Sequence, residues 1–200
     1  MFTGIIEQTG IVSNLKQSGS NLIITVHSSF ANELKVDQSV SHNGVCLTVT
    51  EIFPEKNLYN VTAIDETLKR TNLKFLKANN KINLERGMLM TTRLDGHIVQ
   101  GHVDATAVCT KIENKNGSHI FYFENDGSYK NLLVEKGSVT VNGVSLTVVH
   151  AQDTLFTVAI IPYTFLHTTF NFLKTGDVVN VEFDIIGKYV ARLMGNGGNR

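Results

Sequence analysis

Residues 43–49 read NGVCLTV and residues 142–148 read NGVSLTV, so one seven-residue stretch occurs twice, 99 positions apart (142 − 43). The two copies differ at one position, where Cys46 in the first corresponds to Ser145 in the second. Asn and Gly both tolerate the positive φ of a tight turn or a bulge, and the residues that follow alternate as in a strand. The stretch therefore predicts a turn leading into a strand, present in two related copies.

Three further pairs of segments repeat in the same order, each displaced by 97 positions (163 − 66). They are ETLKRTNL (66–73) with YTFLHTTF (163–170), INLE (82–85) with VNVE (179–182), and GIIE (4–7) with GHVD (101–104). A displacement this long indicates duplication of a whole domain, because solenoid repeats have periods of roughly 20 to 50 residues. We expect an N-terminal domain over 1–96, a C-terminal domain over 97–186 and a tail over 187–200.

Most of each copy has the pattern of short strands, rich in β-branched residues and separated by turn formers. The strand-like segments are NLIITVHS, SVSHNGVCLTVTEI, NLYNVTAI and KINLER in the first copy, and HIFYFEN, SVTVNGVSLTVVH, TLFTVAII and VVNVEFD in the second. They predict an all-β fold of two small antiparallel barrels or sandwiches. Short helices are expected over 30–35, 66–76, 129–136 and 162–174.

The tail is expected to form one more helix, over residues 187–196. Tyr189, Val190, Leu193 and Met194 have helical spacing and form an apolar stripe. Because little chain remains to cover this stripe, docking on another copy of the protein is one interpretation. Fraying into a disordered end is the alternative.

The charge balance excludes several classes of partner. Lys plus Arg and Asp plus Glu each total 18 in the 200-residue chain, without runs of like charge, so neither nucleic acid nor an anionic membrane is expected to bind. No apolar run approaches the roughly 20 residues of a membrane span, and MFTGIIEQTG does not resemble a signal peptide. We therefore expect a cytoplasmic protein. The two cysteines, Cys46 and Cys109, encode neither a disulfide framework nor a thiolate metal site.

The repeated strand places small polar groups on one face. Cys46 and Thr48 share a face, as do Ser145 and Thr147, with aliphatic residues on the other side. Such a strand could line a ligand site, whereas the structural alternative makes them ordinary strand residues, with Cys as a small core hydrophobe. The occurrence of both polar positions in both copies favours the ligand site.

GHIVQGHVD, residues 96–104, contains two histidines. His97 and His102 lie five positions apart, and no third ligand lies at a helpful distance, so metal binding is poorly supported. Either histidine could carry a proton near neutral pH. A histidine bonded to backbone at a domain junction is the structural alternative.

Taken together, FTGIIE, HNGVCLTV, ETLKRTNL, GHIVQGHVD, NGVSLTVV and IPYT resemble the riboflavin synthase family, in order and over essentially the whole chain. The resemblance implies two tandem six-stranded Greek-key β-barrels with short helices, a C-terminal oligomerisation helix and a homotrimer. Each barrel would bind one 6,7-dimethyl-8-ribityllumazine, and a productive pair would meet between the N-terminal barrel of one subunit and the C-terminal barrel of a neighbour. Lumazine synthase is a possible partner.

The reaction that the resemblance implies is a dismutation that completes riboflavin biosynthesis. One lumazine gives a four-carbon unit to another, yielding riboflavin and 5-amino-6-ribitylamino-pyrimidinedione, with neither cofactor nor metal. His102 is the candidate base for the acidic 7-methyl group. Cys46, Ser41 and Ser145 are candidate nucleophiles, and Phe2 matches an aromatic residue that the family needs for activity.

The resemblance also implies a set of substrate contacts. Positions matching the N-terminal pocket are Gly4, Ile5, Ile6, Thr48, Thr62, Ala63, Ile64, Asp65, Glu66, Thr67 and Val103. Positions matching the C-terminal pocket are Gly101, Lys136, Ser145, Thr147, Ala159, Ile160, Ile161, Pro162, Tyr163 and Thr164. Cys46, Leu47, His102 and Leu146 complete the set. Asn142 stands where some relatives have Asp, which argues against a carboxylate role there and leaves Asp184 available.

Two other functions remain open at this point. A noncatalytic lumazine-binding antenna protein would keep one pocket for a fluorophore, yet both matched pockets and the GHIVQGHVD segment are present here. The flavin-binding barrel of an oxidoreductase would need a nicotinamide-binding domain, and no GxGxxG follows a strand in this chain.

Overall fold

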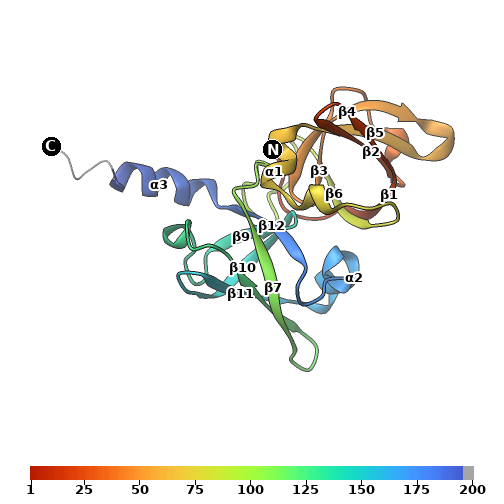
Figure 1. Ribbon diagram of the computed structural model, residues 1–200. Helices are drawn as coiled ribbons and strands as arrows, with labels where there is room; N and C mark the ends of the chain where they lie inside the picture. Colours follow the sequence, from red (N-terminus) through yellow and green to blue (C-terminus); the bar gives the residue numbers. More distant parts are fainter. Residues whose placement is uncertain (196–200) are drawn as a thin grey trace.

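The computed structural model describes residues 1–195, which form two closed antiparallel β-barrels and a projecting C-terminal helix (Figure 1). The N-terminal barrel has the strand order β1-β2-β5-β4-β3-β6, and the C-terminal barrel has the order β10-β11-β8-β7-β12-β9. Equivalent strands occupy equivalent places in the two rings, which confirms the predicted pair of six-stranded barrels. The strands are β1 (Gln8–Ser18), β2 (Asn21–His27), β3 (Ser39–His42), β4 (Val45–Phe53), β5 (Leu58–Ala63), β6 (Lys81–Arg86), β7 (Ala105–Asn114), β8 (His119–Glu124), β9 (Ser138–Val141), β10 (Val144–Ala151), β11 (Leu155–Ile160) and β12 (Val178–Phe183).

The repeated motif forms the β3–β4 and β9–β10 hairpins. Asn43 and Asn142 both have φ of 47°, and the glycine after each also has positive φ, as the Asn-Gly pattern predicts. On β4, Val45, Leu47 and Val49 point into the barrel, where each is at most 5% exposed. The intervening polar side chains face outward, so the predicted alternation is confirmed.

The two cores differ in composition. Aliphatic side chains with Phe30 and Tyr59 form the N-terminal core, whereas the C-terminal core contains five phenylalanines: Phe121, Phe123, Phe156, Phe170 and Phe183. Phe121 packs edge-on against Phe170, with 4.9 Å between ring centroids, a favourable aromatic geometry. The duplicated fold therefore tolerates different interiors as long as the inward positions stay apolar.

The helical segments are shorter than predicted. The expected helix over 66–76 is divided into α1 (Asp65–Arg70) and the 3-10 helix η3 (Asn72–Phe75), because Thr71 adopts an extended conformation between them. The Thr71 hydroxyl donates to Thr67 O (2.7 Å) and accepts from Leu73 N (3.3 Å), which stabilises the break. The C-terminal barrel repeats this arrangement in α2 (Pro162–His167) and η5 (Thr169–Asn171), while residues 30–35 and 129–136 form only the 3-10 turns η1 (Ala31–Glu33) and η4 (Lys130–Leu132). A further 3-10 turn, η2 (Pro54–Lys56), joins β4 to β5.

Asparagine side chains join the two barrels across a local pseudo-twofold axis. Asn83 Nδ2 donates to Asn142 O, and its counterpart Asn180 Nδ2 donates to Asn43 O, both at 2.8 Å. The two Asn-Gly turns touch at the axis, where a Cβ on Gly44 would lie 2.8 Å from the backbone nitrogen of the opposing Gly143. The Asn-Gly turn of each repeated motif therefore forms part of the interface between the barrels. The strand that follows the turn lies on the outer surface of its barrel.

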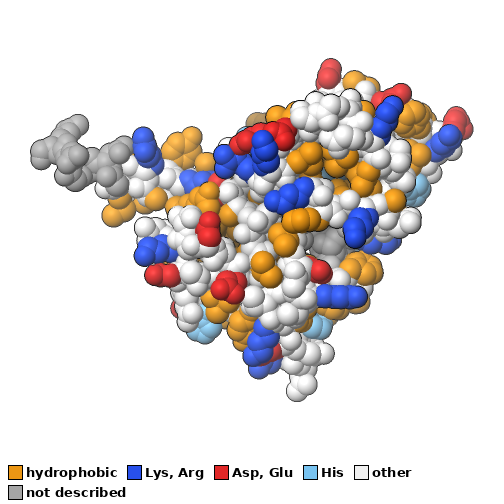
Figure 2. Space-filling model, viewed as in Figure 1, with side chains coloured by type: hydrophobic (Ala, Val, Ile, Leu, Met, Phe, Trp, Pro, Cys, Tyr) orange, Lys and Arg blue, Asp and Glu red, His pale blue; other side chains and the backbone are white. Residues whose placement is uncertain are grey.

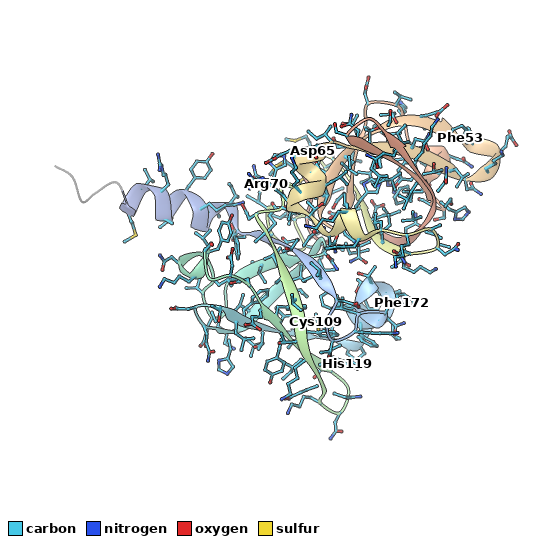
Figure 3. The ribbon with its side chains drawn as sticks, in the orientation of Figure 1. Phe53, Asp65, Arg70, Cys109, His119 and Phe172 are labelled. Carbon is cyan, nitrogen blue, oxygen red and sulfur yellow. The ribbon has the colours of Figure 1, made fainter. Side chains whose placement is uncertain are left out.

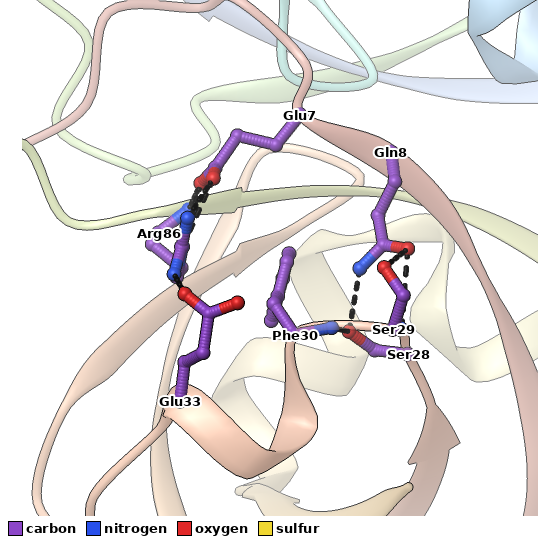
Figure 4. A network of polar contacts seen from close by, with 7 residues as sticks. All are labelled: Glu7, Gln8, Ser28, Ser29, Phe30, Glu33 and Arg86. Carbon is purple, nitrogen blue, oxygen red and sulfur yellow. Dashed lines mark hydrogen bonds and ion pairs between the residues drawn. The ribbon is translucent and has the colours of Figure 1, made fainter.

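Ion pairs secure the outer side of the N-terminal barrel (Figure 4). Arg86, the last residue of β6, bonds Glu7 at 2.6 Å and Glu33 at 2.7 Å, and its guanidinium covers the Phe30 ring. Because Glu7 immediately precedes β1, the network closes the seam between β1, β6 and η1. These partners are partly exposed, so each pair contributes about 1 kcal/mol or less.

The C-terminal helix α3 (Ile185–Gly195) leaves the C-terminal barrel and projects beyond it (Figure 1). Its exposed hydrophobic side chains are Ile186, Tyr189, Val190, Leu193 and Met194, and Figure 2 shows hydrophobic groups gathered along this helix. The structure thus bears out the expected helix and its apolar stripe over the described residues. The alternative of a disordered end concerns residues 196–200, which lie outside the described residues. No helix among residues 1–195 is long and apolar enough to cross a membrane.

Candidate functional site

Two short segments cross between the barrels and pair where they meet. The first crossing segment, residues 2–6, and the second, residues 99–103, run antiparallel, and Phe2 N donates to Val99 O at 2.7 Å. Gly4 O then accepts from Ser145 N at 2.8 Å on the C-terminal barrel, and Gly101 O accepts from Cys46 N at 2.9 Å on the N-terminal barrel. Each motif strand is therefore flanked by a segment that belongs to the other repeat.

Glycine is required at both crossing points. Gly101 has φ of +79°, and a Cβ there would lie 2.6 Å from the Cβ of Cys46. Gly4 has φ of +77°, and a Cβ there would lie 2.6 Å from the Cβ of Ser145. Both the backbone conformation and the close approach exclude larger residues.

The crossing places some of these residues beside the other barrel from the one expected, while their contact with substrate stays a prediction. Gly4 and Ile6 were expected in the N-terminal pocket, but Gly4 contacts Ser145 and Ile6 packs on the C-terminal core, with Ile5 between them. Gly101 was expected in the C-terminal pocket, but it contacts Cys46. Val103 packs on the N-terminal core. The two crossing segments pair with each other through Phe2 and Val99. Each then bonds the motif strand of the opposite barrel before the chain enters the first strand of its own barrel.

The N-terminal half-site consists of Cys46, Thr48, residues 62–67 and residues 101–103. Val49 pairs with Val61, which brings Thr48 level with Thr62 on neighbouring strands. The stretch then enters α1, whose ends are marked by Asp65 and Arg70 in Figure 3. Thr48 and the His102 side chain are exposed, so this surface is accessible.

The C-terminal half-site repeats this arrangement with Ser145, Thr147, residues 159–164 and residues 4–6. Val148 pairs with Val158, which brings Thr147 level with Ala159. Lys136 is exposed, and its backbone N–H donates to the carbonyl of Val148 on the strand that carries Ser145. Thr147, Ala159, Ile161, Pro162 and Tyr163 are all exposed.

Several expected contact residues face the barrel interiors or the barrel interface. Leu47 and Ala63 belong to the N-terminal core, and Leu146 and Ile160 belong to the C-terminal core. Only their backbone groups are therefore available to a ligand. Two of the candidate catalytic residues, Phe2 and Ser41, are buried as well, at 0% and 1% exposure.

His97 was considered as a proton carrier or a structural histidine but was not among the expected site residues, and the structure places it at Ser145. Its Nδ1 lies 2.6 Å from Ser145 Oγ, and its Nε2 lies 3.1 Å from Thr140 Oγ1. Burial lowers the pKa of His97, and nearby Asp184 opposes this effect. A neutral imidazole between two hydroxyls can accept from one and donate to the other. The signal available in the sequence was the histidine itself, and its contact with Ser145 depends on long-range packing.

Two buried carboxylates, Glu85 and Glu182, were also missed as site residues. They end the repeated INLE and VNVE stretches, and each accepts backbone N–H groups from one crossing segment. Burial raises the pKa of both carboxyls, that of Glu182 to about 6. Asp184, by contrast, accepts from Ile186 N at 3.0 Å at the start of α3.

Two hollows in the described part of the chain are centred away from the motif strands. A groove of about 600 Å³ follows the barrel interface beside Asn43, Asn72 and Asn142. A second hollow, of about 660 Å³, lies beside the Arg86 network and includes Ile5. Neither hollow is lined by Cys46, Thr48, Ser145 or Thr147, and both threonines are exposed on a single chain. Residues 1–195 also contain no cluster of three or more potential metal ligands among His, Cys, Asp and Glu.

Comparisons with known proteins agree with this duplicated architecture. The family model described as Lumazine binding domain matches residues 3–87 and 100–184. The riboflavin synthase of Bacillus subtilis (strain 168) is 41% identical over 195 residues, covering 97% of this chain and 90% of that protein. The riboflavin synthase of Mycobacterium tuberculosis (strain ATCC 25618 / H37Rv) is 38% identical over 202 residues, covering 99% and 100%.

Solved structures show the same fold. LumP complexed with 6,7-dimethyl-8-(1'-D-ribityl) lumazine superposes with a TM-score of 0.82 at 21% identity, covering 91% of this chain and 98% of that one. LumP complexed with riboflavin gives 0.83 at 22% identity, covering 92% and 99%. At this identity the likeness concerns the fold alone. The two matched domains and the near-full-length relatives establish that this chain belongs to the riboflavin synthase family of duplicated lumazine-binding proteins.

Proposed function

We propose that this protein is a riboflavin synthase that converts two molecules of 6,7-dimethyl-8-ribityllumazine into riboflavin and 5-amino-6-ribitylamino-pyrimidinedione. The observation that carries the proposal is the presence of two equivalent open half-sites, built around Cys46 and Ser145. A reaction between two identical molecules needs two similar binding surfaces, which a duplicated domain supplies. The names of the relatives support the same reaction.

The two half-sites would meet between subunits. Both are exposed on a single chain, so a neighbouring copy can cover each of them and exclude water. We propose that the N-terminal half-site of one subunit faces the C-terminal half-site of the next within a homotrimer. The uncovered apolar stripe of α3 supports assembly, because burying it removes hydrophobic surface from water.

Chemistry would begin with proton loss from the 7-methyl group of one lumazine. His102 is our candidate base, since its side chain is exposed beside the N-terminal half-site. The anion formed would attack the partner lumazine after a nucleophile has added to C7 of that ring. Cys46 and Ser145 are the accessible candidates, whereas Ser41 lies buried behind Cys46 as its cross-strand partner.

Much of the rate would come from positioning the two reactants. Holding two large molecules face to face replaces a bimolecular encounter and can contribute about 7–11 kcal/mol. The reaction transfers a four-carbon unit between identical rings, so no net oxidation is required, and we propose no cofactor. We also propose that the enzyme acts in the cytoplasm and can associate with lumazine synthase.

The test is to incubate the purified protein with 6,7-dimethyl-8-ribityllumazine alone and to follow riboflavin by absorbance and fluorescence. We expect one riboflavin for every two lumazines consumed. Tight binding without turnover would contradict the proposal and point to a noncatalytic lumazine-binding protein. A second arm with added metal ions should leave the rate unchanged.

A further inference from the structure

One side chain, Glu182 on β12, holds the second crossing segment in place. Its carboxylate accepts hydrogen bonds from three consecutive backbone N–H groups: Gln100 at 2.7 Å, Gly101 at 2.9 Å and His102 at 2.9 Å. The side chain is only 2% exposed, so water cannot replace these bonds. The conformation of the peptide that carries His102 therefore depends directly on this carboxylate.

The first repeat is built differently at the equivalent place. Glu85 accepts from the backbone N–H groups of Thr3 and Gly4, and its remaining bond comes from the Thr3 hydroxyl. The next residue, Ile5, donates its N–H to the Thr3 hydroxyl at 3.2 Å, not to the carboxylate. Ile5 is the counterpart of His102 at the 97-residue displacement. The direct bond from a carboxylate to this position is therefore specific to the repeat that carries the histidine.

The charged groups near Glu182 bond to each other and not to its carboxylate. Lys188 on α3 pairs with Asp104 at 2.7 Å; the lysine lowers the pKa of Glu182 and the aspartate raises it. On β9 the cross-strand neighbour of Glu182 is Thr140, which bonds the ring of His97. Among the described residues, every hydrogen-bond donor to the Glu182 carboxylate lies in the second crossing segment.

We infer that Glu182 is a positioning residue for the reaction, and that its negative charge fixes the backbone of Gly101 and His102 so that the His102 imidazole faces the N-terminal half-site. The role of His102 in this inference rests on the proposed function. An ionised carboxylate accepts at both oxygens, whereas a protonated carboxyl turns one of them into a donor. Protonation therefore removes the charge and weakens the bonds from the three N–H groups in a buried site.

The pH range in which this happens follows from the burial of the carboxyl, which raises the pKa of Glu182 to about 6. Above pH 7 the carboxylate is charged and the segment is held. Between pH 7 and pH 5 it becomes neutral and the hold weakens. Because the geometry of a catalytic group controls its rate contribution, activity should fall with the loss of this charge.

The first experiment observes the segment itself and needs no activity. Backbone amide resonances of Gly101 and His102 would be recorded by 1H–15N NMR of the labelled full-length protein between pH 8 and pH 5. We expect downfield amide protons that move upfield together with a midpoint near 6. In Glu182→Gln the amide protons of Gly101 and His102 should lie upfield of their wild-type positions at pH 8 and should not shift as the pH is lowered. Glu55→Gln, at an exposed position in η2, is the control and should titrate as wild type does. Amide shifts of Gly101 and His102 that do not titrate in the wild-type protein would overturn the inference, even where the variant fails to fold.

The second experiment compares turnover. At pH 7.5 we expect kcat of Glu182→Gln to be about tenfold or more below wild type, with a smaller change in KM and with Glu55→Gln unchanged. The ratio of wild-type to Glu182→Gln kcat should decrease severalfold on going to pH 5, because the wild-type carboxyl becomes neutral there. A kcat ratio that stays constant with pH would mean that the negative charge of Glu182 does not position His102. If the wild-type protein forms no riboflavin, the proposed function fails, and the amide titration still decides whether Glu182 holds the segment.

Discussion

At the scale of single residues, the site depends on two glycines that let the crossing segments touch the motif strands. We expect Gly101→Ala to lower the free energy of unfolding by about 2 kcal/mol, because its Cβ would overlap Cys46 in a well-packed contact. Gly19→Ala is the matched control, since it also has positive φ, +61°, but no neighbouring atom within 4 Å. Urea unfolding of both variants checks this. Equal losses would show that backbone strain alone, not the contact with Cys46, explains the requirement for glycine.

His42 offers a second residue-scale test, through the pH dependence of stability. Its Nδ1 donates to Val40 O at 3.0 Å, so Nε2 accepts from the Tyr59 hydroxyl at 2.8 Å and the buried ring is held neutral. Burial lowers the pKa of His42 from 6.5 to about 4. The unfolded chain therefore binds the proton more tightly, and stability is lost as pH falls from about 6.5 to about 4.

The size of that loss should be about 3 kcal/mol, since each unit of pKa difference corresponds to about 1.4 kcal/mol. Free energies of unfolding measured in urea at pH 7 and pH 4 give the value. His42→Gln lacks the titrating group and should be less stable at pH 7 but should lose less on acidification. A variant with the same pH dependence as wild type would assign the acid loss to other groups.

At the scale of elements, the interface between the barrels depends on equivalent asparagines of β6 and β12. Asn180 donates to Asn43 O and accepts from Asn72 N, in a buried position. We expect Asn180→Ala to cost about 2–4 kcal/mol, because two buried backbone groups lose their partners. Asn83→Ala should cost a similar amount, and the exposed Asn131→Ala should be neutral. The check is thermal or urea unfolding, and an unaffected Asn180→Ala would show that the network does not contribute to stability.

The elements that the sequence predicted well are those determined by local patterns. Alternating residues predicted the strands, and the 97-residue displacement predicted two equivalent barrels. The helices were predicted too long because Thr71 and Thr168 are extended, and each hydroxyl donates to the carbonyl four residues earlier and accepts from the N–H two residues later. No local pattern predicts that break, because threonine is acceptable within a helix until tertiary packing selects the alternative.

The site was only partly predictable for a related reason. Cys46, Thr48, Ser145 and Thr147 could be placed together because they share strand faces within one motif. The exchange of crossing segments, the contact of His97 with Ser145 and the anchoring by Glu182 join residues 48 to 141 (145 − 4) positions apart. Such contacts depend on how the barrels pack, which periodicity along one strand cannot specify.

At the scale of the whole molecule, α3 presents apolar side chains that residues 1–195 of a single chain leave exposed. Leu193 is 73% exposed, and we expect Leu193→Glu to shift the assembled protein toward monomers by placing a charge in an apolar contact. Sedimentation velocity at several concentrations measures the shift. Lys16→Glu, at an exposed position on β1, is the control and should leave the distribution unchanged. A wild-type protein that is already monomeric at micromolar concentration would contradict the proposed assembly.

A mixing experiment tests most directly whether each active site is made from half-sites of two different subunits. His102→Ala impairs the N-terminal half-site, and Ser145→Ala impairs the C-terminal half-site, so each variant alone should form riboflavin slowly from 6,7-dimethyl-8-ribityllumazine. After the two are unfolded together and refolded, some interfaces join the intact N-terminal half-site of one subunit to the intact C-terminal half-site of another. We expect riboflavin formation well above the mean of the separate variants. A mixture no faster than that mean would contradict an active site shared between subunits.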